Sequence, residues 1–447
     1  MISYPLPVLD AADAAAAEAA LAEGAVRLLS GTVVDPAGVT RAKHVPAARA
    51  MAFHTAGMGA SPSWNVFCID NALAFRPGFG VVGDLRLRAD LAALRVLGDG
   101  LAWAPAEMFD QDGAPAPVCT RGLLRRTQAE LERHGVTALV GAELEFVVPE
   151  RAGGPWNAYG LGPVLDVEPV VLDLVAACAA AGLPLEQVHA ESGAGQLELS
   201  LPPADPLAAA DGVVLARLLA CRVARRHGLT VSFSPLPFAD GAGNGAHQHL
   251  SLFRDGVPLL SGGAGPHGLT PEGEAAIGGI VAGLPDLLGV LAGSVLSAHR
   301  LQPGHWSGAH ACWGLENREA AVRLCAATPG NPHGASVEVK CIDPSANPYL
   351  AIAALLGLAA DGVSRRAALP PEATVDPASL TGADAPARLP VDQAAALAAL
   401  DASPLAERLL GTAIRTCLSA VRHHELDTYG EDDVAVLAER FRFTWSS

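Results

Sequence analysis

The sequence predicts an α+β protein in which a smaller, mostly β N-terminal domain precedes a larger domain of mixed structure. From about residue 46 to 117 the chain is rich in turns and short strand-like runs. Beyond residue 119, short apolar segments of strand length alternate with long helical patterns. The run Ala-Pro-Ala-Pro at 114–117 lies between the two regions, so we place the boundary there and expect domains at 1–115 and 116–447.

Cap and stop residues support the order of the elements. Thr120 is the expected N-cap of a helix that runs to His134 and stops at Gly135. Thr270 and Asn347 each precede a proline, a pair typical of helix starts. The other expected helices are 8–24, 167–182, 205–227, 271–298, 347–366 and 391–423. The expected strands are 25–34, 138–148, 196–201, 230–235, 246–253 and 335–342.

The composition is that of a folded chain with an acidic surface. Half of the 447 residues are hydrophobic, 17% are charged, and the formal net charge is −17. Because phosphate binding needs basic patches, this charge argues against nucleic acid as a partner and suits a cationic small molecule. The eight cysteines are scattered without a Cys-x-x-Cys pair, so we expect a cytoplasmic protein, without a signal peptide. The apolar run 275–297 contains Pro285 and Asp286, which favours a core helix over a membrane span.

Acidic side chains alternate with apolar ones in the expected strand that contains Glu143 and Glu145. Strand geometry puts these two carboxylates on one face, roughly 6.5–7 Å apart. Two further segments show the same alternation: one puts His247, His249 and Ser251 on one face, and the other does the same for Glu338 and Lys340. A glycine-containing turn that enters a strand adds Glu191 and Glu198.

An ordinary amphipathic edge strand could explain any one of these segments. Five glutamates and a histidine on four otherwise apolar segments are better explained by a shared cavity that holds two divalent cations. Five carboxylates against the four charges of two such ions leave the cluster near neutrality. The glycine-rich run 240–245 is either a flexible loop or, beside such a site, a set of backbone N–H groups that bind phosphate or carboxylate through Gly243, Asn244 and Gly245.

Several motifs, in order, resemble those of glutamine synthetases. They are Gly-Ala-Glu-Leu-Glu-Phe at 141–146, His-Ala-Glu-Ser-Gly-Ala-Gly-Gln-Leu-Glu at 189–198, Gly-Asn-Gly-Ala-His-Gln-His-Leu-Ser at 243–251, Asn-Arg at 317–318, and Glu-Val-Lys-Cys-Ile-Asp-Pro-Ser-Ala-Asn-Pro-Tyr at 338–349. Segments 34–43 and 83–90 resemble motifs of the N-terminal domain of that family. The resemblance implies a β-grasp N-terminal domain and a barrel-like catalytic sheet. It also implies a homo-oligomer, expected to be a dodecamer of two stacked hexameric rings, with each active site at a subunit junction.

The resemblance also implies a role for each motif residue. Glu145, Glu191 and Glu198 would hold one Mg²⁺ or Mn²⁺ ion, and a second set would hold another ion near the nucleotide phosphates: Glu143, His247 and Glu338. The residues expected to serve ATP are His249, Ser251, Arg318, Arg323 and Lys340. The residues expected to bind the carboxylate or amine are Arg300, Gly243, Asn244, Gly245, Ser63, Trp64, Trp306 and Lys340. Those expected to take part in catalysis are Arg300, Arg318, Trp306 and Asp70.

The mechanism that the resemblance implies has two steps. A carboxylate attacks the γ-phosphate of ATP to give an acyl phosphate, while metals and arginines neutralise the transferring group. An amine then displaces phosphate, and because the amine must lose a proton, this step needs a nearby base or anion.

The sequence departs from true glutamine synthetases where the amine is bound. Trp306 stands where the family's flap carries a glutamate, and the segment 59–64, which normally offers an aspartate to ammonium, carries Ser63 and Trp64. Asp70 lies close to that segment. Further departures are Ala242-Gly243 at the place of a glutamate-binding asparagine, Ser336 in place of an arginine, and Lys340 in place of another basic residue.

These departures favour the γ-glutamyl amide and polyamine ligases that resemble glutamine synthetase. Trp306 could be a core or loop aromatic, but an indole in place of a carboxylate weakens selection for ammonium and favours an organic amine. The alternatives are a true glutamine synthetase, a ligase for a carboxylate other than glutamate, and a catalytically silent structural or regulatory relative. The complete set of six candidate metal ligands argues against the last.

Overall fold

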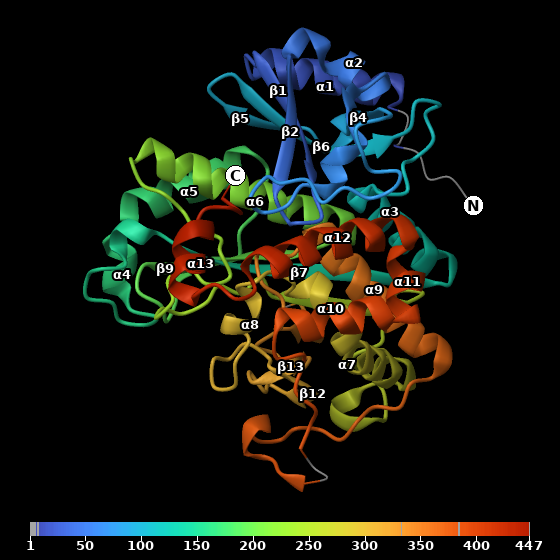
Figure 1. Ribbon diagram of the computed structural model, residues 1–447, viewed down its shortest axis with the longest axis vertical. Helices are drawn as coiled ribbons and strands as arrows, with labels where there is room; N and C mark the ends of the chain where they lie inside the picture. The colour runs from blue at the N-terminus through green and yellow to red at the C-terminus, as the bar shows by residue number, and fades with distance from the viewer. Residues whose placement is uncertain (1–5, 7–8, 332, 383–384, 447) are drawn as a thin grey trace.

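The computed structural model describes residues 6, 9–331, 333–382 and 385–446. It confirms the α+β class and shows two β-sheets with helices packed around the larger one (Figure 1). In the N-terminal region the elements are α1 Ala11–Glu23, β1 Leu28–Val34, β2 Thr40–Pro46, α2 Ala50–Thr55, β3 Met58–Ala60, β4 Leu85–Ala89, β5 Arg95–Gly98 and β6 Leu101–Phe109.

The rest of the described chain forms the larger sheet and most of the helices. Its strands are β7 Val136–Val147, β8 Gln187–Ala190, β9 Gln196–Ala204, β10 Gln248–Arg254, β11 Val257–Pro258, β12 His310–Leu315, β13 Ala320–Cys325 and β14 Ser336–Val339. Its helices are α3 Thr120–Arg133, α4 Leu161–Leu165, α5 Glu168–Ala180, α6 Pro206–Arg226, α7 Pro271–Leu291, α8 Ser297–Arg300, α9 Pro348–Arg365, α10 Gln393–Ala402, α11 Pro404–Leu410, α12 Thr412–Tyr429 and α13 Val434–Phe441.

The N-terminal sheet is mixed and has its own apolar core. Its strand order is β2-β1-β6-β4-β3, with β5 also paired to β6; β1 runs parallel to β6, whereas the other pairs are antiparallel. Figure 1 shows these strands in blue beneath α1 and α2, at one end of the molecule. The predicted domain boundary falls between β6 and α3; that division of the chain stays a prediction.

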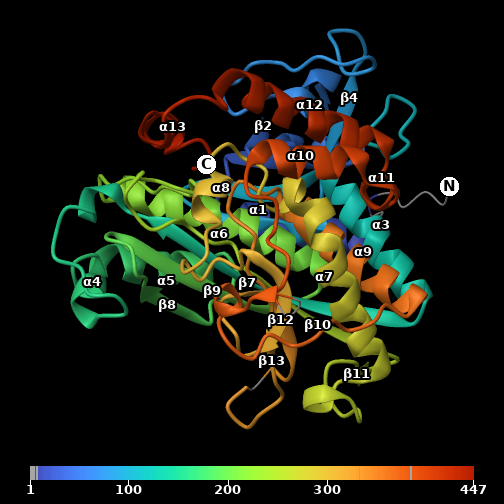
Figure 2. The same ribbon diagram turned by 60° about the horizontal axis from the view of Figure 1, so that its bottom comes forward.

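The larger sheet has the order β12-β13-β14-β10-β7-β9-β8, with β11 paired to β10. Helices α7 and α9 lie side by side, as both ribbon views show (Figure 2). They approach closely because glycines face each other: a Cβ on Gly279 would lie 2.5 Å from the Cα atom of Gly362. Helix α7 is long and apolar enough to span a membrane, but 78% of its most apolar window is buried within the protein, in keeping with the predicted core helix.

Four details of the predicted elements were wrong. Segment 230–235 is not a strand but makes a single bridge, between Ser232 and Val147. The helix predicted over 271–298 ends at Leu291, and the short α8 follows after a break.

The long helix predicted over 391–423 is three helices, because Pro404 starts α11 and Gly411, with φ +77°, separates it from α12. At the start of α3 the cap is Cys119, whose Sγ accepts a hydrogen bond from the Gly122 N–H, and Thr120 is the first helical residue. The predicted caps Thr270 and Asn347 are confirmed, since each side chain accepts a backbone N–H in the first turn.

Candidate active site

The alternation along β7 exposes its glutamates to a cavity. Ala142, Leu144 and Phe146 are buried in the core, whereas Glu143 and Glu145 are half-buried and line a cavity of about 930 Å³. The two strand faces therefore separate as the sequence predicts, and the carboxylates share the open face.

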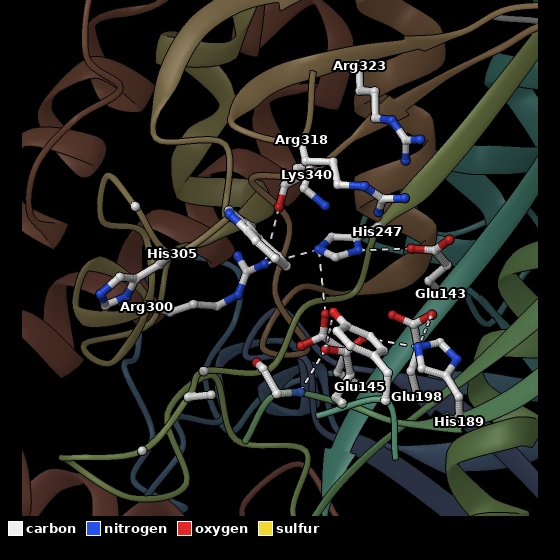
Figure 3. A pocket seen from close by; sticks show the side chains of 18 of the residues that line it. Glu143, Glu145, His189, Glu198, His247, Arg300, His305, Arg318, Arg323 and Lys340 are labelled. Atoms are coloured by element: carbon white, nitrogen blue, oxygen red, sulfur yellow. Dashed lines mark hydrogen bonds and ion pairs between the residues drawn. The ribbon is translucent and has the colours of Figure 1, made fainter. Parts of the chain in front are cut away.

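Strand register then adds acidic residues from other segments. Glu198 on β9 pairs with Glu145, and Glu338 on β14 pairs with His249 on β10. His247, just before β10, has Nδ1 3.1 Å from Glu143 Oε2 and 3.5 Å from Glu338 Oε1. We call Glu143, Glu145, Glu191, Glu198, His247 and Glu338 the acidic cluster. Figure 3 shows His247 at its centre, with Glu143, Glu145 and Glu198 around one side of the ring.

Ligand atoms of the acidic cluster lie close enough together to hold cations. Three groups of side chains each bring their ligand atoms within 4.8 Å of one another: Glu143, His247 and Glu338; Glu145, Glu198 and His247; His189, Glu191 and Glu198. Carboxylate oxygens with an occasional imidazole are the donors that Mg²⁺ and Mn²⁺ prefer. The donor set therefore fits two or more such ions.

The electrostatics of the cluster show an excess of negative charge. Burial raises the pKa of Glu198 to about 9, and the neighbouring carboxylates of Glu143, Glu145 and Glu191 add to the rise. Burial also acts to raise the pKa of Glu143, but hydrogen bonds from His247 and His249 outweigh it and hold that pKa well below its usual range. Divalent cations among these carboxylates would remove the repulsion that the raised pKa of Glu198 reports.

Basic side chains line the opposite side of the cavity. We call Arg300, Arg318, Arg323 and Lys340 the basic wall, and all four line the cavity. Figure 3 shows Arg318, Arg323 and Lys340 on the other side of His247 from Glu145 and Glu198, with Arg300 beside the imidazole ring. Lys340 Nζ lies 3.0 Å from Glu338 Oε1, and Arg323 binds the other oxygen of Glu338 at 3.1 Å. Burial acts to raise the pKa of Glu338, but Lys340 and His247 lower it to about 2.

One N–H group of the Arg300 guanidinium has no hydrogen-bond partner among the described residues. Arg300 is 5% exposed, and its NH2 group lies 3.3 Å from both His247 Nε2 and the carbonyl of Lys340. The group without a partner is NH1, which is buried. A buried guanidinium N–H without a partner is costly. Because Arg300 lines the cavity, its guanidinium is a candidate to bind an anion there.

Glycine allows the 240–245 loop to pass close to this arginine. Gly243 lines the cavity, and a Cβ at that position would lie 2.6 Å from Arg300 Cγ. Gly245 donates its N–H to Glu145 Oε2 at 2.8 Å, so it supports the acidic cluster and does not face the cavity. Asn244 is fully buried, and its amide donates to the carbonyls of Ser232 and Ser234.

Other predicted site residues lie outside the cavity wall. His249 binds Glu143 Oε1 at 3.2 Å from behind the cluster, and the buried Ser251 donates its hydroxyl to the Ala335 carbonyl. Among the described residues, Ser63, Trp64 and Asp70 do not line the cavity either. Asp70 accepts hydrogen bonds from Tyr429 and His424 on α12. The roles of these residues stay predictions.

Trp306 is a loop residue and not a core aromatic. Its side chain is 54% exposed and lines the cavity beside His305. Its φ of +51° is a left-handed conformation that is rare for a bulky residue.

Two of the cavity residues that were not predicted contact the acidic cluster. His189 Nε2 lies 3.0 Å from Glu191 Oε1 and 3.7 Å from Glu198 Oε1, and the period-2 relation of His189 to Glu191 was a signal that could have found it. Tyr159 donates its hydroxyl to Glu191 Oε2 at 3.1 Å from an irregular segment, where no periodic pattern pointed to it.

Comparison with known proteins gives consistent matches over most of the chain. A family model described as glutamine synthetase, catalytic domain, matches residues 117–436. The chain is 40% identical over 429 residues, 92% of each chain, to a gamma-glutamylpolyamine synthetase of Streptomyces coelicolor. It is 32% identical over 315 residues to the glutamine synthetase of Pyrococcus horikoshii, covering 67% of this chain and 69% of the relative.

Solved structures agree with the sequence matches. The crystal structure of a novel glutamine synthase homolog superposes with a TM-score of 0.86 at 31% identity, covering 94% of this chain and 99% of the other. The complex of GmaS with ADP superposes with a TM-score of 0.81 at 25% identity, covering 93% and 97% of the two chains.

Proposed function

This chain belongs to the glutamine synthetase family and is an ATP-dependent carbon–nitrogen ligase, and we propose that it joins glutamate to a primary amine as a γ-glutamyl amide. One observation carries the proposal: the same cavity has the acidic cluster on one side and the basic wall on the other. A metal–nucleotide complex and a carboxylate substrate need those two surfaces next to each other.

The metal ligands in this proposal come from the acidic cluster. Glu145, Glu191 and Glu198 hold one Mg²⁺ or Mn²⁺ ion. The second ion is held by Glu143, His247 and Glu338. The bound ions supply Lewis-acid stabilisation of the charge that develops on the transferring phosphoryl group. The second set is supported by the convergence of its ligand atoms within 4.8 Å of one another. For the first set, Glu198 converges with Glu145 in one group and with Glu191 in another, and the raised pKa of Glu198 reports excess negative charge among these carboxylates.

The basic wall completes the first step. Arg300 binds the carboxylate substrate, while Arg318 and Arg323 bind and neutralise the phosphates of ATP. The carboxylate then attacks the γ-phosphorus of ATP, the bond from that phosphorus to the bridging oxygen breaks, and the products are an acyl phosphate and ADP. Lys340 stays ion-paired with Glu338, so it adds positive charge without moving into the cavity.

The amine enters where the exposed Trp306 borders the cavity. An indole face attracts an alkylammonium chain by cation–π and apolar contact, which a bare ammonium ion uses less well. Asp240 and Glu191 also line the cavity and attract the cation. The name of the Streptomyces relative indicates polyamines, and we propose the same class of amine here. Asp70, from a neighbouring subunit of a dodecameric ring, is the proposed partner of the attacking amine.

A substrate comparison on purified protein tests the function. Release of phosphate from ATP is measured with Mg²⁺ and glutamate plus ammonium, ethanolamine, a monoamine, putrescine or spermine. We expect kcat/KM to be highest with an organic amine and the product to be a γ-glutamyl amide by mass spectrometry. A higher kcat/KM with ammonium would identify a true glutamine synthetase. Turnover that does not need glutamate would identify another carboxylate, and absence of any nucleotide turnover would identify a silent relative.

A further inference from the structure

The loop between α8 and β12 carries Trp306 in a strained backbone conformation. A non-glycine residue in the left-handed region costs about 1–3 kcal/mol and persists only where the surrounding structure fixes it. Gly304 and Gly308, on either side, also have positive φ angles, of 78° and 74°. The loop thus turns sharply around Trp306 and holds the indole in the cavity.

One carboxylate fixes this loop. Glu319 Oε1 accepts a hydrogen bond from the Trp306 N–H at 2.8 Å, and Glu319 Oε2 accepts one from the Gly304 N–H at 3.3 Å. Hydrogen bonds to a charged acceptor are about twice as strong as neutral ones. Both oxygens of Glu319 therefore stabilise the strained segment that presents the indole.

Glu319 is itself held in place from the other side. Its N–H donates to Asn317 Oδ1 at 3.1 Å, and the Asn317 amide donates to the carbonyls of Ala373 and Val375. The far end of the loop is also fixed, because a Cβ on Gly308 would lie 2.9 Å from the Ala321 Cα atom. The loop therefore contacts the β12–β13 turn through Glu319 and packs closely on strand β13 at Ala321.

The position of Glu319 excludes a direct catalytic role. Glu319 does not line the cavity, whereas its neighbour Arg318 and the loop residues His305 and Trp306 do. Each of its two oxygens accepts a hydrogen bond from a backbone N–H of the loop. It acts on the cavity only through the loop that it binds.

We propose that Glu319 is a positioning residue that fixes Trp306 as a wall of the amine site and thereby sets the preference for organic amines over ammonium. The inference rests on the proposed function for the identity of the amine. It adds to that function a residue, Glu319, whose carboxylate binds the backbone N–H groups of Gly304 and Trp306 and so stabilises the strained backbone of the loop.

Kinetics of Glu319→Ala test this positioning role. We expect KM for the organic amine to rise by about ten-fold, the effect of losing hydrogen bonds to a charged group, while KM for glutamate and for ATP changes less than two-fold. The ratio of kcat/KM for the organic amine to that for ammonium should fall. Equal effects on all three substrates would overturn the inference. Glu319→Gln, which keeps the shape and one acceptor oxygen, should fall between Glu319→Ala and the wild type.

A double-mutant cycle separates positioning from general damage. If Glu319 acts through Trp306, then Trp306→Ala and the double variant Trp306→Ala/Glu319→Ala should have the same KM for the amine. If the increase in amine KM in the double variant equals the product of the increases in the two single variants, the inference is overturned.

The matched control is Glu372, whose Oε1 accepts the Leu315 N–H at 3.0 Å at the end of β12, outside the cavity wall. Glu372→Ala removes a similar carboxylate–backbone contact and should leave the amine KM unchanged. The outcome for the proposed function is read from the wild type alone. If the wild type prefers ammonium, the proposed preference for organic amines is wrong. The double-mutant cycle can then be measured with ammonium, and it still decides whether Glu319 acts through Trp306.

Discussion

Two of the buried charge clusters in the described part of this protein differ in how well their charges are paired. The first joins the N-terminal sheet to the helices and consists of Arg121, Arg125, Asp90, Glu107 and Asp211; we call it the Arg121 network. Arg121 contacts Glu107 at 2.6 Å, Asp211 at 2.8 Å and Asp90 at 2.9 Å. In the acidic cluster, by contrast, carboxylates face one another across His247.

The pKa shifts show what the difference means. Although burial acts to lower the pKa of Arg121, its carboxylate partners, Asp211 first, raise that pKa well above the usual range, so the charge is stabilised where it lies. Burial and like charges do the opposite to Glu198, whose pKa rises to about 9. In the Arg121 network each carboxylate contacts a guanidinium of the same chain, and only Asp90 Oδ1 among their oxygens is buried without a hydrogen-bond partner in the described residues. The acidic cluster keeps a repulsion between carboxylates that bound cations would relieve, and strongly perturbed groups of this kind are typical of active sites.

The largest effect on stability is expected in the Arg121 network. Arg121→Met leaves Glu107, Asp90 and Asp211 buried without their main partner, so the free energy of unfolding should fall by about 3–5 kcal/mol. Urea unfolding followed by circular dichroism measures it. The control is Arg408→Met, which removes an exposed pair with Asp361 and should cost less than about 1 kcal/mol. Equal losses in the two variants would mean that the network does not hold the N-terminal sheet to the helices.

Loss of a proposed metal ligand should instead abolish activity with little loss of fold. Glu145→Gln keeps an acceptor for the Gly245 N–H but removes a charge from the acidic cluster, so we expect no detectable amide formation. In the wild type, Mg²⁺ at 100 times its Kd should stabilise the fold by about 2.7 kcal/mol relative to EDTA. That metal-dependent shift in melting temperature should be much smaller in Glu145→Gln. Normal turnover in this variant would refute its assignment as a metal ligand, and the exposed Glu431→Gln serves as the control.

The smallest effect is a pH dependence of the metal-free protein. The pKa of Glu198 is raised from 4.5 to about 9 in the folded state. Between these values the folded state keeps a proton that the unfolded state releases, so the stability from this group is present at low pH and is lost as pH rises toward 9. In EDTA, the melting temperature should fall more between pH 6 and 8.5 for the wild type than for Glu198→Gln, by about 2 °C. Identical pH profiles would show that Glu198 is not under this repulsion.

The sequence predicted the parts of the site that local geometry controls. Alternation along β7 is sufficient to place Glu143 and Glu145 on one face, because successive strand residues always point to opposite sides. The caps at Thr270 and Asn347 were found for the same reason, since a cap acts within one helical turn. The prediction of a single helix over 391–423 was wrong, because two short breaks, at Pro404 and Gly411, interrupt a run that is otherwise rich in alanine.

By itself, then, the sequence determined the α+β class, the polar faces of the strands and the acidic residues that converge on the cavity. Only the tertiary structure decided which atoms meet: the opposition of Glu198 to Glu145, the unpartnered NH1 group of Arg300, and the contact of Glu319 with the backbone of Trp306. The physical reason is distance along the chain. Side-chain direction follows from neighbouring residues, whereas strand register and loop contacts depend on the packing of segments that are far apart in sequence.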